Sequence, residues 1–580
     1  MTVESLITQY IDTWTSTVKT KSTSGRGSRK KLELYGVKKL RELILELAIR
    51  GKLVPQDLND EPASVLLERI AAEKAQLVKE KKIKASRKYA PIDNDSLPFE
   101  TPLGWKWARI EDLGHDLGQK TPDQAFTYID VGAINKELGF VEDPSVLDDS
   151  NAPSRARKLV KNGTVIYSTI RPYLLNIAVI DKVIEPEPIA STAFAIIHPL
   201  NGIYSSYLYR YLRSPSFIKY VESVQTGIAY PAINDKQFFF GLIPVPPTKE
   251  QHRIVAKVDE LMTLCDQLEQ QTEASIKAHQ LLVSTLLNTL TNSADADELM
   301  ENWARISEHF DTLFTTEGSI DQLKKTILQL AVMGKLSKPL DSDTPVSNHL
   351  DSILEQQKLT ASAKEFKLIE SELVSAKAEV DGNRVMLKAR CFCDFITKGT
   401  TPSKTELLEI GDVPFLKVYN IVDNQLDFDY RPIFISQGVH EGKLRRSMAS
   451  PGDVIMNIVG PPLGKVTVLT DQYAQWNMNQ ALAVFKPVDV VFNRYLYYVL
   501  SCDLTLNSVL KEVKGTAGQD NLSLEQCRDL LIPVIGIEEQ KRLVELVDIL
   551  LGQCKFLKAR LKDSQTTQLY LTDAIVEQAI

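Results

Sequence analysis

The sequence predicts an α+β protein in which two α/β globules are separated by long antiparallel coiled-coil helices, arranged as a circularly permuted repeat with a pseudo-two-fold axis. Two internal repeats carry this prediction. Residues 40–70 (LRELILELAIRGKLVPQDLNDEPASVLLERI) return without a gap as residues 323–353 (LKKTILQLAVMGKLSKPLDSDTPVSNHLDSI), and residues 242–268 (LIPVPPTKEQHRIVAKVDELMTLCDQL) return as residues 531–557 (LIPVIGIEEQKRLVELVDILLGQCKFL). Two long copies of one unit indicate an internally duplicated protein, which suits a target with two halves.

The helical regions are predicted from apolar spacing and from glycine positions. Leu40, Leu43, Ile44 and Leu47 recur at the i, i+3, i+4, i+7 spacing of an amphipathic helix. Gly51 follows them where a helix C-cap is expected, and Gly334 takes the same place in the second copy. We expect helices within residues 35–96, 249–383 and 536–580. The second of these regions is predicted to be a coiled-coil spacer from an a/d-like seam formed by Ile254, Val258, Leu261, Leu264 and Leu268.

Two regions between the helices, residues 97–248 and 384–535, have the texture of α/β globules. Short β-rich runs bounded by turn residues predict strands in the first, at residues 126–134, 163–170, 177–180 and 192–199. The globules share a frame, because NGTVIYSTIRP (162–172) aligns with PGDVIMNIVGP (451–461), and AFAIIHP (193–199) aligns with ALAVFKP (481–487). The residues between these segments differ freely, which predicts one fold that binds something different in each copy.

The order of the parts predicts how the chain is closed. The helix after the first globule runs directly into the second helix pair, whereas the helix after the second globule reaches the end of the sequence. We therefore expect residues 35–96 to pair with the C-terminal helix. Residues 1–34 are assigned to an N-terminal extension and linker. An insert near residues 292–319 has no convincing counterpart there, and an extra helix and a partner contact are both open for it.

Composition excludes several classes of protein. A chain of 580 residues with 43% hydrophobic and 25% charged residues is expected to hold several globular domains. No apolar run is long enough for a membrane span and no secretory signal is found. The scattered cysteines suit a reducing cytoplasm, where we expect the protein. The six cysteines form no CxxC pair, which favours free thiols over disulfides or zinc ligands. Cys265 and Cys554 are expected to be small core residues.

The net charge of −7 argues against a chain that binds nucleic acid through overall basicity. Basic residues are nevertheless concentrated in residues 19–52 and 74–88. Two interpretations stay open for these stretches: solvated helix faces, or patches that bind phosphate.

The repeated ILxLAxxGKL segment, the IPxPPxxEQxxI segment that enters a long helix, and the Thr-Pro-bearing globules together resemble the specificity (S) subunit of type I restriction–modification enzymes. The resemblance covers roughly residues 35–580. It implies that the globules are target recognition domains, each reading one half of a split, asymmetric sequence in double-stranded DNA. It implies that the helices set the spacing and dock two methyltransferase (M) subunits, through which restriction (R) subunits join. It implies no cofactor in this chain, S-adenosylmethionine in the M subunits for adenine N6 methylation, and ATP and Mg in the R subunits.

No catalytic set is found in the sequence, so we expect a non-catalytic subunit. An adenine methyltransferase needs a glycine-rich cofactor loop and an N/D-P-P-Y/F element for the flipped base, and no such tetrapeptide occurs. GPPLGK (460–465) has one residue too few between its glycines for a P-loop, and Val466 stands where Ser or Thr is needed. The alternative hypothesis is a scaffold whose coiled rod spaces two protein-binding globules. A self-sufficient methyltransferase–nuclease is disfavoured by the missing motifs.

Candidate DNA-reading residues are polar side chains in segments that align between the two globules but have different residues. Polar types are chosen because Arg, Lys, Asn, Gln, Ser and Thr read base edges. In the first globule these are Lys120, Thr121, Asn135, Lys136, Ser168, Thr169, Arg171, Tyr173, Tyr230, Asn234 and Lys236. In the second they are Lys398, Thr400, Thr401, Lys404, Tyr419, Asn420, Asn457, Lys465, Lys514, Thr516, Gln519 and Asn521. Ordinary loop polarity explains any one of them equally well, and many DNA contacts go to phosphate without carrying sequence information.

Two sets of apolar residues have a structural and a functional interpretation. Trp105 is expected to anchor a core rather than to stack on a base. The repeated leucines and isoleucines of the helices are expected to seal the intramolecular coil for the most part, rather than to face an M subunit. These residues are Leu40, Ile44 and Leu47 in the first copy and Leu323, Ile327 and Leu330 in the second.

Overall fold

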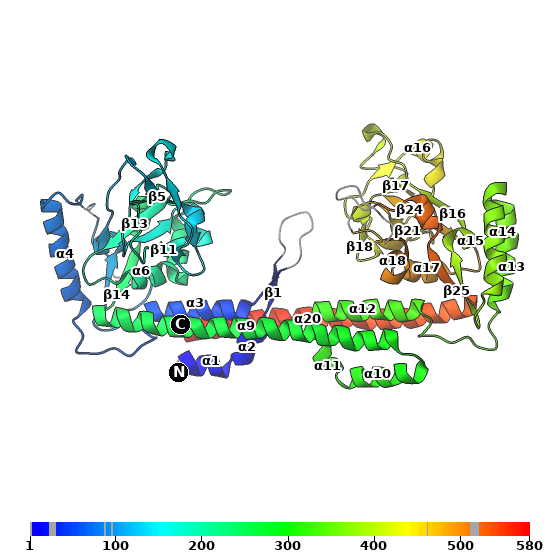
Figure 1. Ribbon diagram of the computed structural model, residues 1–580, viewed down its shortest axis with the longest axis horizontal. Coiled ribbons are helices and arrows are strands. Elements are labelled where there is room, and N and C mark those ends of the chain that lie inside the picture. The colour runs from blue at the N-terminus through cyan, green and yellow to red at the C-terminus, as the bar shows by residue number, and fades with distance from the viewer. Residues whose placement is uncertain are drawn as a thin grey trace. The chain divides into compact units, whose positions relative to one another are not determined.

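The computed structural model describes residues 3–21, 31–85, 87, 89–93, 95, 97–460, 462–510 and 521–580. The chain divides into two compact units (Figure 1). The first unit is Met1–Ser275 with Ser564–Ile580, and the second unit is Ile276–Asp563. Two long helices, α9 (Thr248–Asn292) and α20 (Ile537–Ala579), contribute residues to both units. The last residues of the chain therefore belong to the unit that contains the N-terminus.

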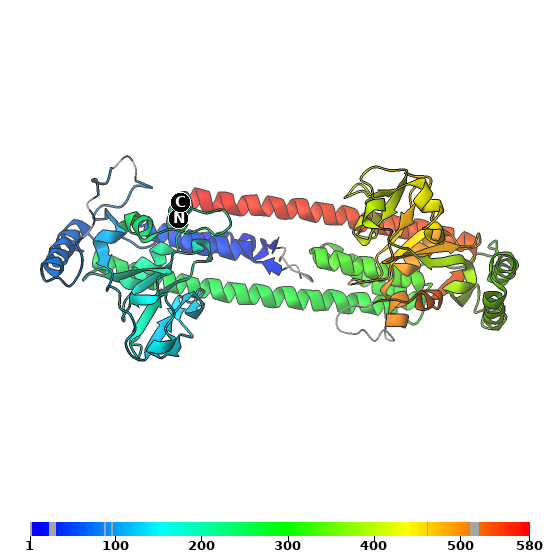
Figure 2. The same ribbon diagram turned by 90° about the horizontal axis from the view of Figure 1, so that it is seen from above.

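In the first unit, α3 runs between the start of α9 and the end of α20 (Figure 2). Arg41 of α3 pairs with Asp266 of α9 at 2.6 Å, and the Tyr35 hydroxyl donates to Asp573 of α20 at 2.8 Å. The helices and the antiparallel hairpin strands outside the globule are α1 (Val3–Gln9), α2 (Ile11–Ser16), β1 (Lys19–Lys21), β2 (Lys31–Glu33), α3 (Tyr35–Ile49) and α4 (Ala63–Lys79). The expected linker at residues 22–30 lies outside the described residues.

In the second unit, α12 takes the place that α3 has in the first and runs between α9 and α20 (Figure 2). Lys558 of α20 pairs with Asp321 of α12 at 3.0 Å, and the His279 ring of α9 is hydrogen-bonded to the Leu313 carbonyl at 3.0 Å. The helices outside this globule are α10 (Ala296–Glu308), α11 (Phe310–Leu313), α12 (Glu317–Val332), α13 (Val346–Thr360) and α14 (Ala363–Ala378).

The predicted seal of the helices is found in both units. The side chains on the inner faces of α3 and α12 are buried because their apolar residues recur at helical spacing. They are Leu40, Ile44 and Leu47 in the first unit and Leu323, Ile327 and Leu330 in the second, each at most 7% exposed. Gly51 and Gly334 end the two helices in the left-handed conformation, with φ of 68° and 74°, as expected for helix caps.

The insert near residues 292–319 folds into α10 and α11, and the structure reveals a counterpart for it in the N-terminal extension. α2 begins after Tyr10 and α11 begins after His309, and these N-cap residues have almost the same backbone angles (φ −114°, ψ 26° and φ −110°, ψ 20°). Each short helix then places a buried side chain, Trp14 or Leu313, at the same helical position. The shared letters are only Asp-Thr, in IDTW and FDTL, too few to align from the sequence.

The first globule contains two four-stranded sheets, ordered β11-β10-β13-β4 and β8-β5-β12-β9. In the second sheet β5 and β12 are parallel, and the other pairs of both sheets are antiparallel. The strands are β3 (Lys106–Arg109), β4 (Gly114–His115), β5 (Phe126–Ile129), β6 (Ile134–Asn135), β7 (Phe140–Val141), β8 (Ser145–Leu147), β9 (Ala156–Leu159), β10 (Val165–Ser168), β11 (Ile177–Val179), β12 (Pro188–Ser191), β13 (Phe194–Pro199) and β14 (Leu242–Val245). The α-helices are α5 (Ile110–Leu113), α6 (Ser205–Leu212), α7 (Pro215–Val224) and α8 (Asp235–Phe240).

The second globule repeats this topology. Its main sheet has the order β16-β24-β21-β22, and β17 pairs in parallel with β23 as β5 does with β12. The strands are β15 (Arg384–Lys388), β16 (Cys393–Lys398), β17 (Val413–Leu416), β18 (Ile421–Val422), β19 (Gln425–Leu426), β20 (Phe434–Ile435), β21 (Val454–Asn457), β22 (Val466–Val468), β23 (Asn477–Met478), β24 (Leu482–Pro487) and β25 (Leu531–Ile535). The α-helices are α15 (Ala389–Phe392), α16 (Gln437–Glu441), α17 (Asn493–Leu500), α18 (Asp503–Leu510) and α19 (Leu524–Arg528).

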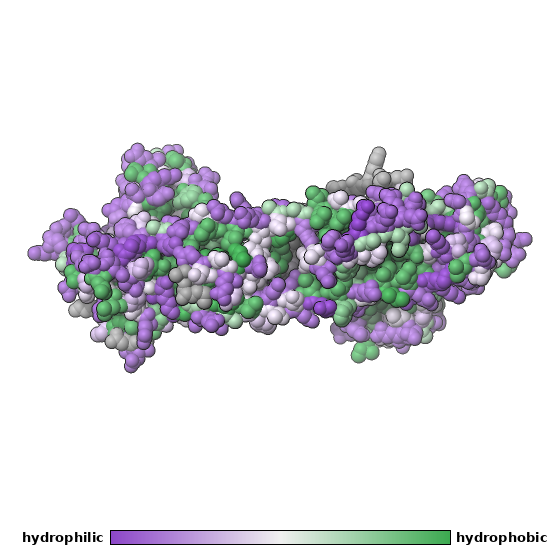
Figure 3. Space-filling model, turned by 90° about the horizontal axis from the view of Figure 1, so that it is seen from below, coloured by the Kyte–Doolittle hydropathy of each residue, from purple (hydrophilic) through white to green (hydrophobic). Residues whose placement is uncertain are grey.

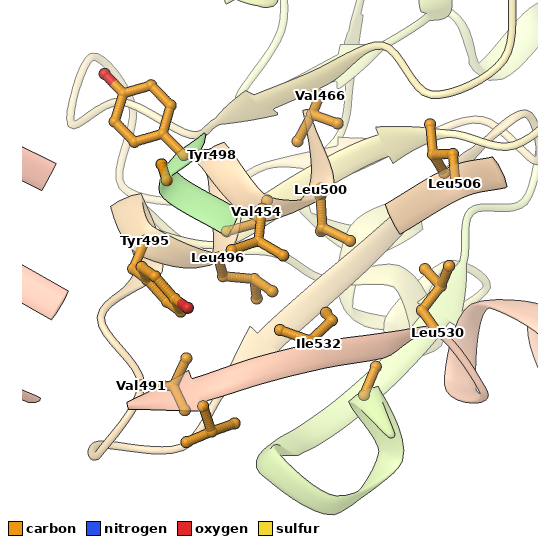
Figure 4. Close-up of a cluster of buried hydrophobic side chains, with 14 of the residues drawn as sticks. Val454, Val466, Val491, Tyr495, Leu496, Tyr498, Leu500, Leu506, Leu530 and Ile532 are labelled. Carbon is orange, nitrogen blue, oxygen red and sulfur yellow. The ribbon is translucent and has the colours of Figure 1, made fainter. Parts of the chain in front are cut away.

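One hydrophobic cluster of the second globule lies between its main sheet and α17. Tyr495, Leu496 and Leu500 of α17 are buried together with Val454 of β21 and Ile532 of β25 (Figure 4). The Tyr495 hydroxyl is satisfied inside this core, since it donates to the Pro533 carbonyl at 2.7 Å. In the first globule the Tyr207 hydroxyl donates to the Pro244 carbonyl at the same distance. Apolar helix faces against a sheet thus fix both globules in the same way.

A buried glutamine joins each globule to the first turn of its long helix. The Gln251 side chain accepts a hydrogen bond from the Tyr204 N–H and donates to the carbonyls of Gly202 and Pro246. Gln540 holds the equivalent position, and both side chains are fully buried. The equivalent partners of Gln540 are the Phe492 N–H and the carbonyls of Val490 and Ile535. The Glu-Gln pair of the repeated segment is therefore part of the joint that orients the globule.

An ion pair strengthens the same joint in each unit. Arg253 pairs with Asp60 at 2.7 Å, and Arg542 pairs with Asp343 at 2.6 Å. Both carboxylates are buried and lie in the loop between the two helices of the repeated pair. This loop, the globule and the long helix are thereby held to one another within each unit.

Trp105 and the cysteines lie where the sequence predicts. Trp105 is 3% exposed and its indole N–H donates to Glu250 at 3.0 Å, so it anchors a core. All six cysteines are free and buried. In the part of the chain that the structure describes, no helix is long and apolar enough to span a membrane.

Candidate nucleic-acid interface

The structure brings two predicted residues of the first globule together at the end of β10. The Arg171 backbone N–H donates to the Pro231 carbonyl at 2.8 Å, which ties the turn after β10 to the loop before α8. The guanidinium carbon of Arg171 lies 4.8 Å from the centroid of the Tyr230 ring. Tyr230 and Tyr173 are 68% and 54% exposed. Aromatic faces and a guanidinium at one surface suit contact with a nucleic acid.

The turn after β10 has an unusual backbone. Arg171 and Leu175 adopt the left-handed conformation, with φ of 49° and 53°. The equivalent residues of the second globule are Gly460 and Gly464, with φ of 82° and 75°. The left-handed region costs a residue with a Cβ atom roughly 1–2 kcal/mol, and glycine does not incur this cost. The same turn is thus built from glycines in one globule and from strained residues in the other.

Beside this turn is a hollow of about 430 Å³. It is lined among others by Tyr128, Asp130, Arg155, Arg171, Asn176 and Tyr230. Arg155 and Asn176 are absent from the predicted set. Asn176 lies just beyond the aligned segment and Arg155 lies before β9, so only the folded sheets bring them to Arg171. An arginine in a polar segment without an aligned partner gives no sequence signal that separates it from ordinary loop polarity.

Five predicted residues have hydrogen-bonding roles within the globules. Ser168, Thr169, Asn420 and Asn457 are buried, and Asn234 caps α8. Their polar atoms are already hydrogen-bonded within the globules: Ser168 Oγ to the Ile170 carbonyl, Thr169 Oγ1 to Ala193, Asn420 Nδ2 to Asp427 and Tyr430, and Asn457 Nδ2 to Pro462. These side chains shape the turns that carry other residues, and the proposed interface leaves them out.

The remaining predicted residues of the first globule lie on separate segments, namely the loop between β4 and β5, the β6–β7 hairpin and α8. Lys120 pairs with Glu187 at 2.8 Å and with Asp123 at 2.9 Å, and these hydrogen-bonded carboxylates raise the pKa of the lysine. Asn135 supports the β6–β7 hairpin, because its Oδ1 accepts from two backbone N–H groups of the turn. Thr121, Lys136 and Lys236 are exposed. None of these is brought to Arg171 by a contact recorded among the described residues.

In the second globule the predicted residues form no single cluster among those described. Lys398, Thr400, Thr401 and Lys404 follow one another on the exposed segment that begins at the end of β16, and Thr401 donates to Gln480. The Tyr419 hydroxyl donates to the Arg431 carbonyl at 3.3 Å, and burial raises the pKa of this tyrosine. Lys465 Nζ donates to the Ile421 carbonyl at 3.2 Å, and Asn521 is exposed opposite Val459. Lys514, Thr516 and Gln519 lie outside the described residues.

Neither a metal centre nor a phosphate-binding loop is supported by the described residues. No group of three or more His, Cys, Asp or Glu side chains among them could hold a metal ion. The GPPLGK segment lies between β21 and β22, and the Asn457 amide donates to the Pro462 carbonyl to close the turn. A P-loop instead connects a strand to a helix, so the place of this segment between two strands does not fit a P-loop.

Comparison with known proteins identifies the relatives of the chain. The family model described as the type I restriction modification DNA specificity domain matches residues 102–278 and 391–563. The chain is 36% identical to the type I restriction enzyme EcoAI specificity subunit and 35% identical to the EcoEI specificity subunit, both from Escherichia coli, over the whole of each chain. It is similar in fold to a chain solved in work on the complex assembly and conformational transition of the type I R-M system. That similarity has a TM-score of 0.50 at 22% identity and covers 83% of this chain and 99% of the other.

Proposed function

This chain belongs to the family of type I restriction–modification DNA specificity subunits, and on that premise we propose that its two globules read the two halves of one split, asymmetric DNA sequence. A specificity subunit is the non-catalytic part of its complex. We assign the two recognition domains to residues 97–248 and 384–535. The helices between them are proposed to set the distance between the half-sites, since a helix rises by about 1.5 Å per residue.

One contrast carries this proposal: the attachment of each globule to its long helix is similar in the two units, whereas the residues of one surface turn differ. The glutamine of the joint and its hydrogen bonds repeat in both units, as Gln251 and Gln540 show. The turn after β10 and its counterpart after β21 both have left-handed residues at their two ends, but the sequence changes from RPYLL (171–175) to GPPLG (460–464). Two readers with one frame and different surfaces suit an asymmetric target, because each then recognises its own half-site.

The net charge of the chain supports a DNA-recognition subunit that needs partner subunits to bind DNA tightly. The chain carries a net charge of −7, whereas affinity for the phosphate backbone comes from clustered Lys and Arg. The isolated chain is therefore expected to bind DNA weakly. Two M subunits, docked on the helices, would supply the clamp as well as S-adenosylmethionine for adenine N6 methylation. R subunits would join through them with ATP and Mg, and the buried free thiols suit a cytoplasmic complex.

Equivalent exposed apolar pairs on the long helices support two docking sites for one kind of partner. Leu281 and Leu282 of α9 are 68% and 52% exposed, and Tyr570 and Leu571 of α20, at the equivalent positions, are 72% and 48% exposed. Figure 3 shows hydrophobic residues gathered between hydrophilic ones on the face that it displays. Exposed apolar pairs repeated in a duplicated protein indicate a repeated interface.

Substitution of each pair tests this docking proposal. Leu281→Asp with Leu282→Asp, and separately Tyr570→Asp with Leu571→Asp, are each expected to reduce binding from two M subunits to one in native mass spectrometry. Ser275→Asp, at an exposed polar position of α9, is the control that should keep two. Two bound M subunits in both double variants would overturn this location of the docking sites.

Methylome sequencing tests the function as a whole. A host that expresses this chain with its cognate M subunit is expected to carry N6-methyladenine in a split, asymmetric motif, and a host that expresses either one alone is not. The motif would give both half-sites and their spacing at once. Absence of the motif, although the M subunit is expressed and assembled with the chain, would overturn the proposal in favour of a scaffold of two protein-binding globules.

A further inference from the structure

The turn after β10 carries an arginine where the fold prefers glycine. Arg171 has a φ of 49°, and the equivalent residue of the second globule is Gly460, with a φ of 82°. Nothing lies within 4 Å of a Cβ atom placed on Gly460, so the glycine there answers the backbone conformation and not a lack of space. A side chain kept at a left-handed position at the cost of strain is an observation that points to a function for that side chain.

The surrounding structure holds this turn in place. Ile170 forms a β-bridge with Ala232, the Arg171 N–H donates to Pro231, and the Ile233 N–H donates to the Thr169 carbonyl at 2.9 Å. The second globule has the same frame at equivalent residues, since Val459 forms a bridge with Asn521 and the Leu522 N–H donates to Ile458. The frame therefore does not require an arginine, because the other copy builds it without one.

The Arg171 side chain is oriented but left without an acceptor. Its guanidinium lies over the Tyr230 ring and borders the hollow that Arg155 also lines. Within the described ranges, neither guanidinium has a hydrogen-bond acceptor or an ion-pair partner. The Tyr230 ring lies on one side of the guanidinium and leaves its donor edge available for a planar acceptor.

We propose that Arg171 is a specificity-determining residue that reads a guanine of the first half-site, with Tyr230 as its positioning residue. This inference rests on the proposed function. Guanine presents O6 and N7 side by side in the major groove, and the arginine fork donates to both. The fork also matches a phosphate, but a phosphate contact carries no sequence information, so a lost base preference in the methylated motif separates the two. Arg155 lines the same hollow and is the second donor available to this half-site.

The residue of the other copy provides the test. Arg171→Gly installs what the second globule carries at this backbone position, so the turn keeps its conformation while the donors are lost. Arg171→Lys keeps the charge but loses the fork. Leu175→Gly is the matched control, because it changes the other left-handed residue of the same turn and removes no donor. Each variant is expressed with the M subunit, the methylated motif is determined, and thermal unfolding checks the fold.

We expect Arg171→Gly to keep the second half-site and the spacing and to lose the preference for guanine at one position of the first half-site. That preference should fall about 10- to 100-fold, the usual value of a bidentate arginine–guanine contact. Arg171→Lys should lose it too, and Leu175→Gly should keep it. Methylation that falls uniformly at all first half-sites, or stays unchanged, in a folded Arg171→Gly variant would overturn the proposal, as would a wild-type first half-site without guanine. A wild-type chain that directs no split motif would instead refute the proposed function itself.

Discussion

The two units attach their globules to the long helices through the same types of residue, but the surfaces of the two globules differ. In each unit a buried glutamine joins the globule to its long helix, and an arginine–aspartate pair joins that helix to the loop of the repeated helix pair. A tyrosine hydroxyl on a proline carbonyl is repeated inside each globule. The turn at the end of the central strand, by contrast, has Arg171 in one unit and Gly460 in the other. The difference indicates that both units need the same geometry where the globule is attached to its helix. The surface turn has no such requirement and can differ between globules that bind different targets.

Even the joint is not repeated in every atom. Glu250 accepts from Gln56 at 3.1 Å through one oxygen and from Trp105 at 3.0 Å through the other. The equivalent Glu539 accepts from Ser337 at 2.7 Å, and its Oε2 is buried without a partner in the described structure. The first unit thus satisfies a buried carboxylate that the second leaves half satisfied, which is costly in a low dielectric.

The largest expected effect comes from the buried glutamines. Gln251→Ala and Gln540→Ala should each lower the free energy of unfolding of the unit that carries the change by about 3 kcal/mol, because backbone groups buried around the amide lose their partners. Urea titration measures this. Gln267→Ala, at an exposed position of α9, is the control and should change it by less than about 0.5 kcal/mol. Markedly unequal losses for the two glutamines would show that the joints are not equivalent.

Trp105→Phe should make the first joint resemble the second. It removes the donor to Glu250 and is expected to cost about 2 kcal/mol at pH 7. Burial already raises the pKa of Glu250, and loss of the donor should raise it further. A carboxyl group with a raised pKa destabilises the fold when it is ionised, and this destabilisation disappears when the group is protonated. The loss of unfolding free energy caused by Trp105→Phe should therefore be smaller at pH 4 than at pH 7.

Trp107→Phe is the matched control for that experiment. The Trp107 indole nitrogen is buried without a hydrogen-bond partner in the described structure, so its removal breaks no hydrogen bond. Urea titrations of both variants at pH 7 and pH 4 give the comparison. Equal losses for Trp105→Phe and Trp107→Phe would mean that the bond to Glu250 contributes nothing.

The two versions of the turn should respond in opposite directions. Gly460→Ala forces a Cβ atom into the left-handed region and should cost about 1 kcal/mol, with no steric clash to confuse the result. Arg171→Gly removes the same strain from the first globule and should not lower its stability. Urea titration of both variants measures the contrast. A loss above about 1 kcal/mol in Arg171→Gly would mean that the arginine is held for the fold.

The smallest effect is expected at the ion pairs. Asp343 receives two hydrogen bonds from Arg542, at 2.7 and 2.6 Å, whereas Asp60 receives one from Arg253. Asp343→Asn should lower the free energy of unfolding by about 1 kcal/mol at pH 7, and Asp60→Asn should lower it by less. Arg542 lowers the pKa of Asp343 to about 2, so wild-type Asp343 stabilises the fold above pH 4 and loses this contribution as the pH falls towards 2. Urea titrations at pH 7 and pH 2.5 should therefore show the cost of Asp343→Asn shrinking, and a constant cost would contradict the assignment.

The sequence by itself determined the duplication, the helices and the kind of globule. Helical periodicity is a local property, so Leu40, Ile44 and Leu47 predict a buried face without knowledge of what covers it. The same holds for Gly51 and Gly334, whose places after the last apolar residue predict helix ends that the structure confirms. The family followed from the combination of repeated segments and is confirmed by relatives that match over the whole chain.

Only the tertiary structure decided which polar residues are available to a ligand. Ser168 and Asn457 look like surface residues in the sequence, but both are buried at the ends of their strands in the folded sheets. The equivalence of α2 and α11, and the position of Arg155 and Arg171 beside one hollow, are likewise seen only in the folded chain. Burial and proximity depend on contacts between distant segments, whereas a sequence pattern shows only local spacing.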